Sequence, residues 1–269
     1  MVDVEYFRNN KLIIYGTGYV AHMFYKALKV HNLQANVLCC VTTYPPEKNE
    51  VFEGIPVYGI QDINTNTNVL ICIAVHESIR TEIENVLKKI TDRYIWIYPC
   101  LYELLLGKPA QRNTIIRVER LLEGYKEDLR LAIRLAAIEQ HDGKNDCGQQ
   151  YYINAQMIHC EKNTADKRWK RFMALVDEWK RSGYNKQFSI TVNTSYEVID
   201  GDHRVSMAVY TGQQAIYGNI YKSELSPQEI HENGAMMSEY ILMQNGFTRR
   251  DIEILKGIQR RYMSAYERK

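Results

Sequence analysis

A strand, a glycine turn and a helix follow one another near the start of the chain, and this order constrains the fold more than any other feature. An apolar run at residues 12–15 leads into Gly16-Thr17-Gly18, and a helical pattern continues as far as Leu28. Glycines at such a turn let the backbone approach a phosphate group and let the helix pack closely. The pattern therefore predicts an α/β fold in which Gly16 and Gly18 bind a cofactor.

Further apolar runs at residues 36–41, 69–75 and 94–98 alternate with helical segments. Such uninterrupted runs are typical of parallel strands that are buried on both faces. We therefore expect a small doubly wound parallel-sheet domain over residues 1–109. A dinucleotide-binding domain carries an acidic residue at the end of its second strand. This chain has Thr43 there, which argues against NAD but leaves a nucleotide or nucleotide sugar open.

A second glycine turn, Asp200-Gly201-Asp202-His203-Arg204, also joins an apolar strand to a helix. The unpaired N–H groups and the positive dipole at a helix start favour phosphate, and Arg204 adds a planar charged fork. Asp200 and Asp202 would repel a bare polyanion, so they indicate a metal ion, a hydroxyl group or a proton in transit. A structural interpretation stays open, in which Asp200 caps the helix and His203 pairs locally with Arg204.

The remaining chain divides by pattern into a connector and a second domain. Residues 110–150 are predicted to be a helical connector, with a helix over residues 115–140 and a polar loop after it. Residues 151–269 are predicted to be an α+β domain with a helical C-terminus. Its expected elements are a helix from Asp166 to Gly183, strands at 188–192, 197–199 and 215–221, and helices after Ser226 and Thr248.

The first domain resembles the N-terminal Rossmann-like domain of bacterial glycan-synthesis proteins such as sugar acetyltransferases. The residues that carry the resemblance are Gly16-Thr17-Gly18, Gly54-Ile55-Pro56-Val57 and a later isoleucine-rich strand, over about the first hundred residues. The resemblance implies a role in surface-glycan synthesis. A docking or dimerising module with an empty pocket stays open as an alternative, and a homo-oligomer would form through this domain.

Residues 157–222 resemble the ParB/sulfiredoxin superfamily. The matching elements are Ile158-His159-Cys160-Glu161, an arginine-bearing helix ending in Gly183-Tyr184, a strand, and the turn at residues 199–204. The resemblance implies that Asp200, Gly201 and Arg204 bind nucleotide phosphates. Asp202 stands where sulfiredoxin needs a cysteine, so sulfinic-acid repair is not expected. No helix-turn-helix DNA reader follows Tyr221, unlike in ParB partition proteins.

Free-serine kinases are the branch that this domain resembles best, because they pair the same turn with an upstream histidine-glutamate segment. The resemblance implies a kinase that transfers phosphate from ATP or ADP to a hydroxyl of an amino acid or a sugar-linked acceptor. Glu161, Asp202 and His203 would be catalytic, and Asp200 would bind Mg²⁺. The alternative is a non-catalytic nucleotide-binding regulator or scaffold of a glycan pathway. NAD(P)-dependent redox chemistry at Gly16 is less favoured.

Composition restricts the partners and the compartment. The formal net charge of +2 is too small to predict a nucleic-acid partner. The six cysteines form no Cys-x-x-Cys pair, which fits a reducing cytoplasm. We expect no signal peptide, and no apolar run approaches the ~20 residues of a membrane span. The sequence therefore predicts a cytoplasmic protein whose partners are a nucleotide and a small acceptor.

Overall fold

The chain folds into two compact units, Met1–Lys108 and Pro109–Lys269. The computed structural model describes residues 4–44, 50–63, 69–76, 79–223, 226–231 and 236–267. The first boundary falls one residue before the end predicted from sequence. Residues 110–150, which were expected to connect two domains, belong to the second unit and supply part of its core.

The first unit is built on a six-stranded sheet in the order β3-β4-β2-β1-β5-β6. Only the β3–β4 pairing is antiparallel among the pairings of the described strands, and the other four are parallel. The chain builds outward from β1 through β2 to β4 and then crosses to β5 on the other side, so the strand order reverses between β1 and β5. The strands are β1 (Lys11–Tyr15), β2 (Val37–Thr42), β3 (Val51–Phe52), β4 (Ile55–Gly59), β5 (Val69–Ile73) and β6 (Tyr94–Trp96).

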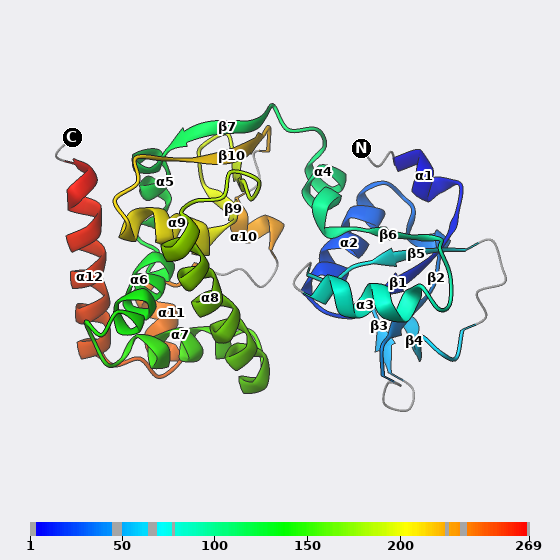
Figure 1. Ribbon diagram of the computed structural model, residues 1–269, viewed down its shortest axis with the longest axis horizontal. Helices are drawn as coiled ribbons and strands as arrows, with labels where there is room; N and C mark the ends of the chain where they lie inside the picture. The colour runs from blue at the N-terminus through cyan, green and yellow to red at the C-terminus, as the bar shows by residue number, and fades with distance from the viewer. Residues whose placement is uncertain are drawn as a thin grey trace. The chain divides into compact units, whose positions relative to one another are not determined.

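Helices cover both faces of this sheet, which explains why all five residues of β5 are buried. On one face Ile83 and Leu87 of α3 (Arg80–Leu87) pack against alternate residues of the central strands (Figure 1). Elsewhere Phe7 of α1 (Val4–Arg8) lies 5.6 Å from Phe24 of α2 (Tyr19–Val30), measured between ring centroids. Helix α4 (Leu101–Leu106) contacts α2. The predicted α/β class is therefore confirmed.

One of the helical segments expected between the apolar runs, over residues 78–89, is described only in part. Helix α3 begins at Arg80, and Ser78 lies outside the described residues. The short helical turns η1 (Gln34–Asn36) and η3 (Tyr98–Cys100) complete the first unit's described elements.

The second unit has a four-stranded sheet in the order β7-β10-β8-β9. Its strands are β7 (Gln111–Arg117), β8 (Ile190–Asn193), β9 (Val198–Asp200) and β10 (Ala215–Tyr221). Strands β8 and β10 are parallel, whereas β7 and β9 pair antiparallel with their neighbours. The single helix predicted over residues 115–140 is thus wrong at its start, and it is also interrupted between α5 (Val118–Leu122) and α6 (Arg130–His141). Ile116 pairs with Ile216 across the sheet, and this distant pairing overrides the local helical spacing.

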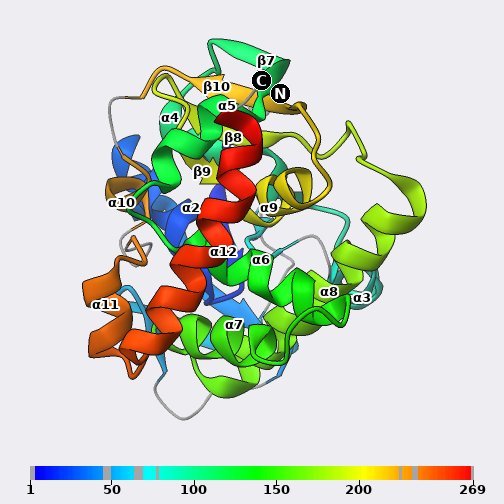
Figure 2. The same ribbon diagram turned by 90° about the vertical axis from the view of Figure 1, so that its left-hand side faces the viewer.

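Helices pack around α6 (Arg130–His141), whose residues from Leu131 to Glu139 are all buried. Helix α12 (Arg249–Glu267) runs across α6 in Figure 2 and contacts it directly. The other helices of the unit are α5 (Val118–Leu122), the short turn η4 (Glu123–Tyr125), α7 (Gly148–Met157), α8 (Lys162–Ser182), α9 (Asp202–Tyr210), α10 (Pro227–Ile230) and α11 (Glu239–Gln244).

Several helix boundaries differ from the predicted ones. Helix α7 begins inside the segment expected to be a loop, and α8 begins four residues before Asp166. The capping box at the start of α10 is confirmed: Ser226 N donates to Glu229 Oε2 at 2.7 Å, and Ser226 Oγ accepts from Glu229 N at 3.3 Å. The single helix expected after it is instead α10 and α11, with residues 232–235 outside the described range. No helix in the described part combines the length and apolar character needed to traverse a bilayer.

Candidate functional site

The turn between β9 and α9 depends on a glycine for two separate reasons. Gly201 has φ +108°, a left-handed conformation that side chains disfavour. A Cβ atom there would lie only 2.5 Å from Cγ2 of Ile190 on β8. Strand β8 pairs with β9, and Asp200 is opposite Thr191. The turn is therefore held closely against the sheet, and this packing fixes the direction in which α9 starts.

The start of α9 presents backbone donors. The carbonyl of Gly201 accepts from the N–H groups of Arg204, at 2.8 Å, and Val205, at 3.0 Å. The N–H groups of Asp202 and His203 precede these two donors and have no acceptor within the described chain. Unpaired N–H groups at the positive end of a nine-residue helix favour an anion.

Asp202 turns its carboxylate toward α6 instead of toward a ligand. Its carboxylate accepts the hydroxyl of Tyr125 and lies 3.5 Å from Nη1 of Arg130 and 3.5 Å from Nη2 of Arg134. Burial by itself would raise the pKa of Asp202, but the two guanidinium groups outweigh that effect and hold the pKa well below its usual range. In this structure Asp202 is therefore an ion-pair partner with a largely buried side chain, and its catalytic role stays a prediction.

The arginines that hold Asp202 form part of a larger polar cluster on α6. Nε of Arg130 donates to Asp128 at 2.6 Å, and Asp128 is only 1% exposed. Burial raises the pKa of Asp128 despite the adjacent Arg130. Nη1 of Arg134 donates to the Arg130 carbonyl at 2.9 Å, while its buried Nε has no partner within the described residues. Arg130 and Arg134, four residues apart in a stretch that is otherwise apolar as far as Ile138, were the sequence signal that could have revealed this cluster.

His203 is buried beside α7 and α8. Its Nε2 lies 2.9 Å from the Tyr152 hydroxyl, and its ring centroid lies 4.4 Å from that of Phe172. Burial, with the charge of Arg134 as the next contribution, holds the pKa of His203 well below its ordinary value. The imidazole is therefore neutral at pH 7 and orients the first turn of α9. This geometry supports a structural role for His203, and its catalytic role stays a prediction.

The low pKa of His203 makes stability dependent on pH. In the unfolded chain this histidine takes up a proton below about pH 6.5, whereas in the folded protein its pKa is lower and it stays neutral to a lower pH. We therefore expect the free energy of unfolding to fall as the pH drops from 7.5 to 5, by at most about 1.4 kcal/mol per pH unit for such a histidine. Urea denaturation at a series of pH values measures this slope.

A variant of His203 separates its contribution to the slope from the contributions of other groups that titrate in this range. His203→Gln is expected to make the slope shallower, because it removes the buried imidazole whose pKa is lowered by folding. A slope that is identical in His203→Gln and the unmodified protein would contradict this prediction. Histidines 159 and 231, whose pKa values burial also lowers, contribute to the remaining slope.

Two arginines without carboxylate partners in the described chain lie near the start of α9. Cζ of Arg204 lies 5.4 Å from the centroid of the Phe188 ring. Arg168 on α8 donates to Oε1 of Gln156 at 2.8 Å, and its charge contributes to the lowered pKa of His203. Positive charge is thus in excess here, which favours binding of phosphate.

Glu161 does not join this group. It is the exposed N-cap residue of α8, whereas Phe172, eleven residues later, is the residue of α8 that contacts His203. A rise of 1.5 Å per residue places Glu161 about 16 Å along the helix axis from that contact. The structure therefore brings together Gly201, His203 and Arg204 but leaves Glu161 away from the turn.

Asp200 adjoins the turn at the end of β9 and is half-buried. Among the described residues no group of three or more histidine, cysteine, aspartate or glutamate side chains could hold a metal ion. Mg²⁺ in nucleotide sites needs only one or two carboxylates, with phosphate oxygens and water completing its coordination. Asp200 could supply one such carboxylate.

The glycine turn of the first unit lies where the strand order reverses. Gly16 has φ +113°, and an added Cβ would lie 2.8 Å from Cγ1 of Val75 and 3.0 Å from the Ala74 carbonyl oxygen, just after β5. Ligands of parallel α/β sheets bind at this reversal. Gly18 is the N-cap of α2. Close to the end of β2, Thr43 Oγ1 forms a hydrogen bond with the Tyr15 hydroxyl at 2.7 Å, so a partly buried pair occupies the place expected for a ribose-binding acid.

A cleft of about 500 Å³ lies elsewhere in the second unit, between α9 and α12. Its charged side chains already have hydrogen-bond partners within the protein. Glu139 accepts from Arg261 and, at 2.9 Å, from the Tyr262 hydroxyl, and Lys144 donates to the Tyr210 hydroxyl at 2.8 Å. The cleft therefore has fewer groups available for a charged ligand than the start of α9.

No protein-family model matches the chain, and a search of curated proteins found no relative. The arguments for function therefore come from the geometry of the turn and from the motifs.

Proposed function

We propose that the second unit binds a nucleotide by its phosphate groups at the start of α9. The observation that carries the proposal is the left-handed Gly201 turn, which leaves two N–H groups available beside an arginine without a carboxylate partner in the described chain. Arg204 would supply paired donors to phosphate oxygens, and the helix dipole would add to the attraction. The resemblance of residues 157–222 to the ParB/sulfiredoxin superfamily supports a nucleotide as the ligand.

Binding without catalysis is the role that these contacts support best. Asp202 is held by Arg130 and Arg134, and Glu161 is about 16 Å along α8 from the contact with His203, so neither is placed to take a proton from an acceptor. A non-catalytic regulator or scaffold of a glycan pathway needs the phosphate contacts but no base. In that role the first unit would serve as a docking or dimerising module.

Phosphoryl transfer is the second candidate, and the position of Asp200 favours it. This carboxylate adjoins the turn and could bind Mg²⁺, which would neutralise charge on the transferred phosphoryl group. The acceptor would be a hydroxyl of an amino acid or of a sugar-linked compound. ADP formation from ATP in the presence of such acceptors, abolished by Asp200→Asn, would distinguish transfer from binding alone.

Calorimetric titration with ATP, ADP, CTP and NAD tests the binding proposal. Arg204→Ala is expected to weaken nucleotide binding by about 10-fold to 150-fold, because a hydrogen bond to a charged group contributes about 1.5–3 kcal/mol. Arg260→Ala is the matched control, since Arg260 is an exposed arginine on α12. Equal affinities in the two variants, or no binding by the unmodified protein, would contradict the proposal.

A further inference from the structure

An aromatic surface adjoins Arg204 on the side of the turn that faces β8. Phe188 is 45% exposed, although it is a large apolar side chain, and the guanidinium of Arg204 lies over its ring. Phe188 is two residues before Ile190, the residue that packs against Gly201. The exposed ring therefore lies just before the strand that packs against the Gly201 turn.

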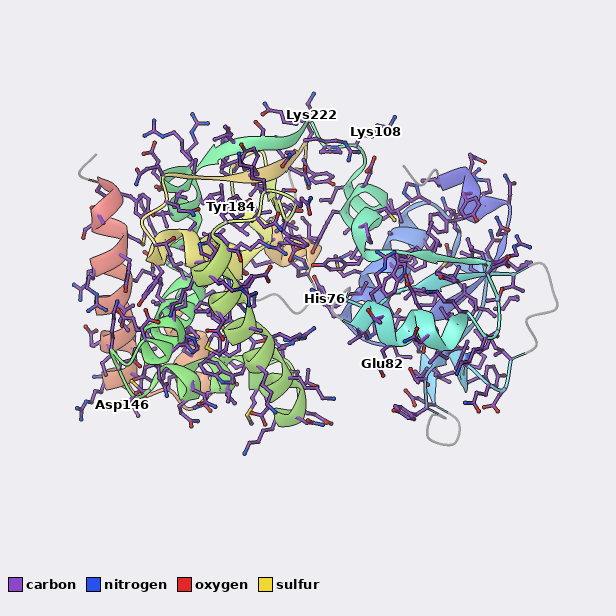
Figure 3. The ribbon with its side chains drawn as sticks, in the orientation of Figure 1. His76, Glu82, Lys108, Asp146, Tyr184 and Lys222 are labelled. Atoms are coloured by element: carbon purple, nitrogen blue, oxygen red, sulfur yellow. The ribbon has the colours of Figure 1, made fainter. Side chains whose placement is uncertain are left out.

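The backbone around this surface is tied to the sheet. The Tyr184 hydroxyl accepts from the N–H of Tyr217 at 2.9 Å and donates to the carbonyl of Tyr217 at 3.1 Å. Trp179 packs against Tyr184, with ring centroids 5.0 Å apart. Figure 3 shows Tyr184 beside the strands of the second sheet. The segment that carries Phe188 is thus anchored at one end by Tyr184 and at the other by β8.

Two further contacts extend the surface and add positive charge. The rings of Tyr184 and Tyr217 stack with centroids 6.3 Å apart and an interplanar angle of 25°. Nζ of Lys186 lies 5.2 Å from the centroid of the Tyr217 ring. Arg204 also lies close enough to Tyr184 for its charge to lower the pKa of that phenol, although burial has the larger, opposite effect. A cation therefore lies over an aromatic ring at each end of the surface, Arg204 over Phe188 and Lys186 over Tyr217.

We infer that this aromatic surface, with Phe188 as its exposed member, binds the base of the nucleotide whose phosphates occupy the turn. The inference rests on the proposed function. A base has two π faces and stacks on aromatic rings and on guanidinium planes whatever its edge groups are. The structure therefore predicts tolerance of different bases, with purines bound more tightly than pyrimidines because their larger rings stack over a greater area.

Comparing ATP with inorganic tripolyphosphate separates the base from the phosphates. Phe188→Ala is expected to weaken ATP binding by about 5-fold to 150-fold, the range for one stacked base, and to leave tripolyphosphate binding unchanged. Phe188→Leu retains apolar bulk if the alanine variant fails to fold, and it should show the same selective loss. Tyr240→Ala is the control, because Tyr240 is an exposed aromatic residue on α11.

The outcomes distinguish this inference from the function on which it rests. If Arg204→Ala weakens both ligands while Phe188→Ala and Phe188→Leu weaken neither, the inference is overturned and phosphate binding stands. Equal weakening of both ligands by the Phe188 variants would also overturn it, since Phe188 would then act only through Arg204. If the unmodified protein binds neither compound, both proposals fail.

Discussion

Asp202→Ala is expected to lower the free energy of unfolding of the second unit by about 3–5 kcal/mol. The reason is that the substitution removes the anion to which Arg130 and Arg134 both point, and it leaves the Tyr125 hydroxyl without its acceptor. Arg134 already has one buried nitrogen without a partner in the described chain, so its loss of Asp202 cannot be compensated locally. Urea denaturation followed by circular dichroism measures the change.

A matched aspartate provides the control. Asp177 on α8 pairs with His141 but its side chain is 65% exposed, so Asp177→Ala should change stability by less than about 1 kcal/mol. If Asp202→Ala were as mild as Asp177→Ala, the buried cluster would not be the structural support that its contacts indicate. Such a result would favour the prediction that Asp202 is a catalytic residue.

Gly148→Ala is expected to cost about 3 kcal/mol or more, at the upper end of the effect of overpacking. A Cβ atom at Gly148 would lie 2.0 Å from the carbonyl oxygen of Ala136 and 2.8 Å from Cα of Ala137. These are backbone atoms of α6, so no side-chain rotation relieves the clash. The Asn145 side chain joins the same two elements, donating to the Ala136 carbonyl at 2.9 Å and accepting from Gly148 N at 3.0 Å.

Gly257→Ala tests whether this cost comes from the close helix contact and not from glycine replacement in general. Gly257 lies within α12, and an added Cβ there has no atom within 4 Å. We expect this variant to gain roughly 0.5–1 kcal/mol, because alanine loses less backbone entropy than glycine in a helix. Thermal unfolding of both variants should give shifts of opposite sign, and two shifts of the same sign would contradict the assignment.

Local patterns predicted most of the first unit. The apolar runs that became β1, β2 and β5 and the glycine turn at Gly16 all carry their signal within a few residues. Strand β7 was missed because its hydrogen bonds go to β10: Asn113 N donates to Asn219 Oδ1, 106 residues later in the chain. Periodicity within residues 115–140 contains no information about that partner, and pairing across the sheet decided the outcome.

The candidate site, like the fold, could be predicted from sequence only where the signal is local. The turn at Gly201 and the cation at Arg204 could be predicted, because a glycine at a strand-to-helix junction is a local signal. The ion pairing of Asp202 could not be predicted, since it depends on Arg130, 72 residues earlier in the chain. The position of Glu161 depends on which turn of α8 contacts α9, and that register is set by Phe172 and its packing against His203.

The pairing of β7 with β10 has a consequence for synthesis on the ribosome. The first strand of the second unit emerges about a hundred residues before its partner. At about 5–20 residues per second, the interval between them is roughly 5–20 s. During that interval the ladder donors of β7 are satisfied only by water or by a chaperone, while the preceding unit has all of its strands available. Ribosome-bound chains of intermediate length should therefore contain a folded N-terminal unit followed by an unpaired segment.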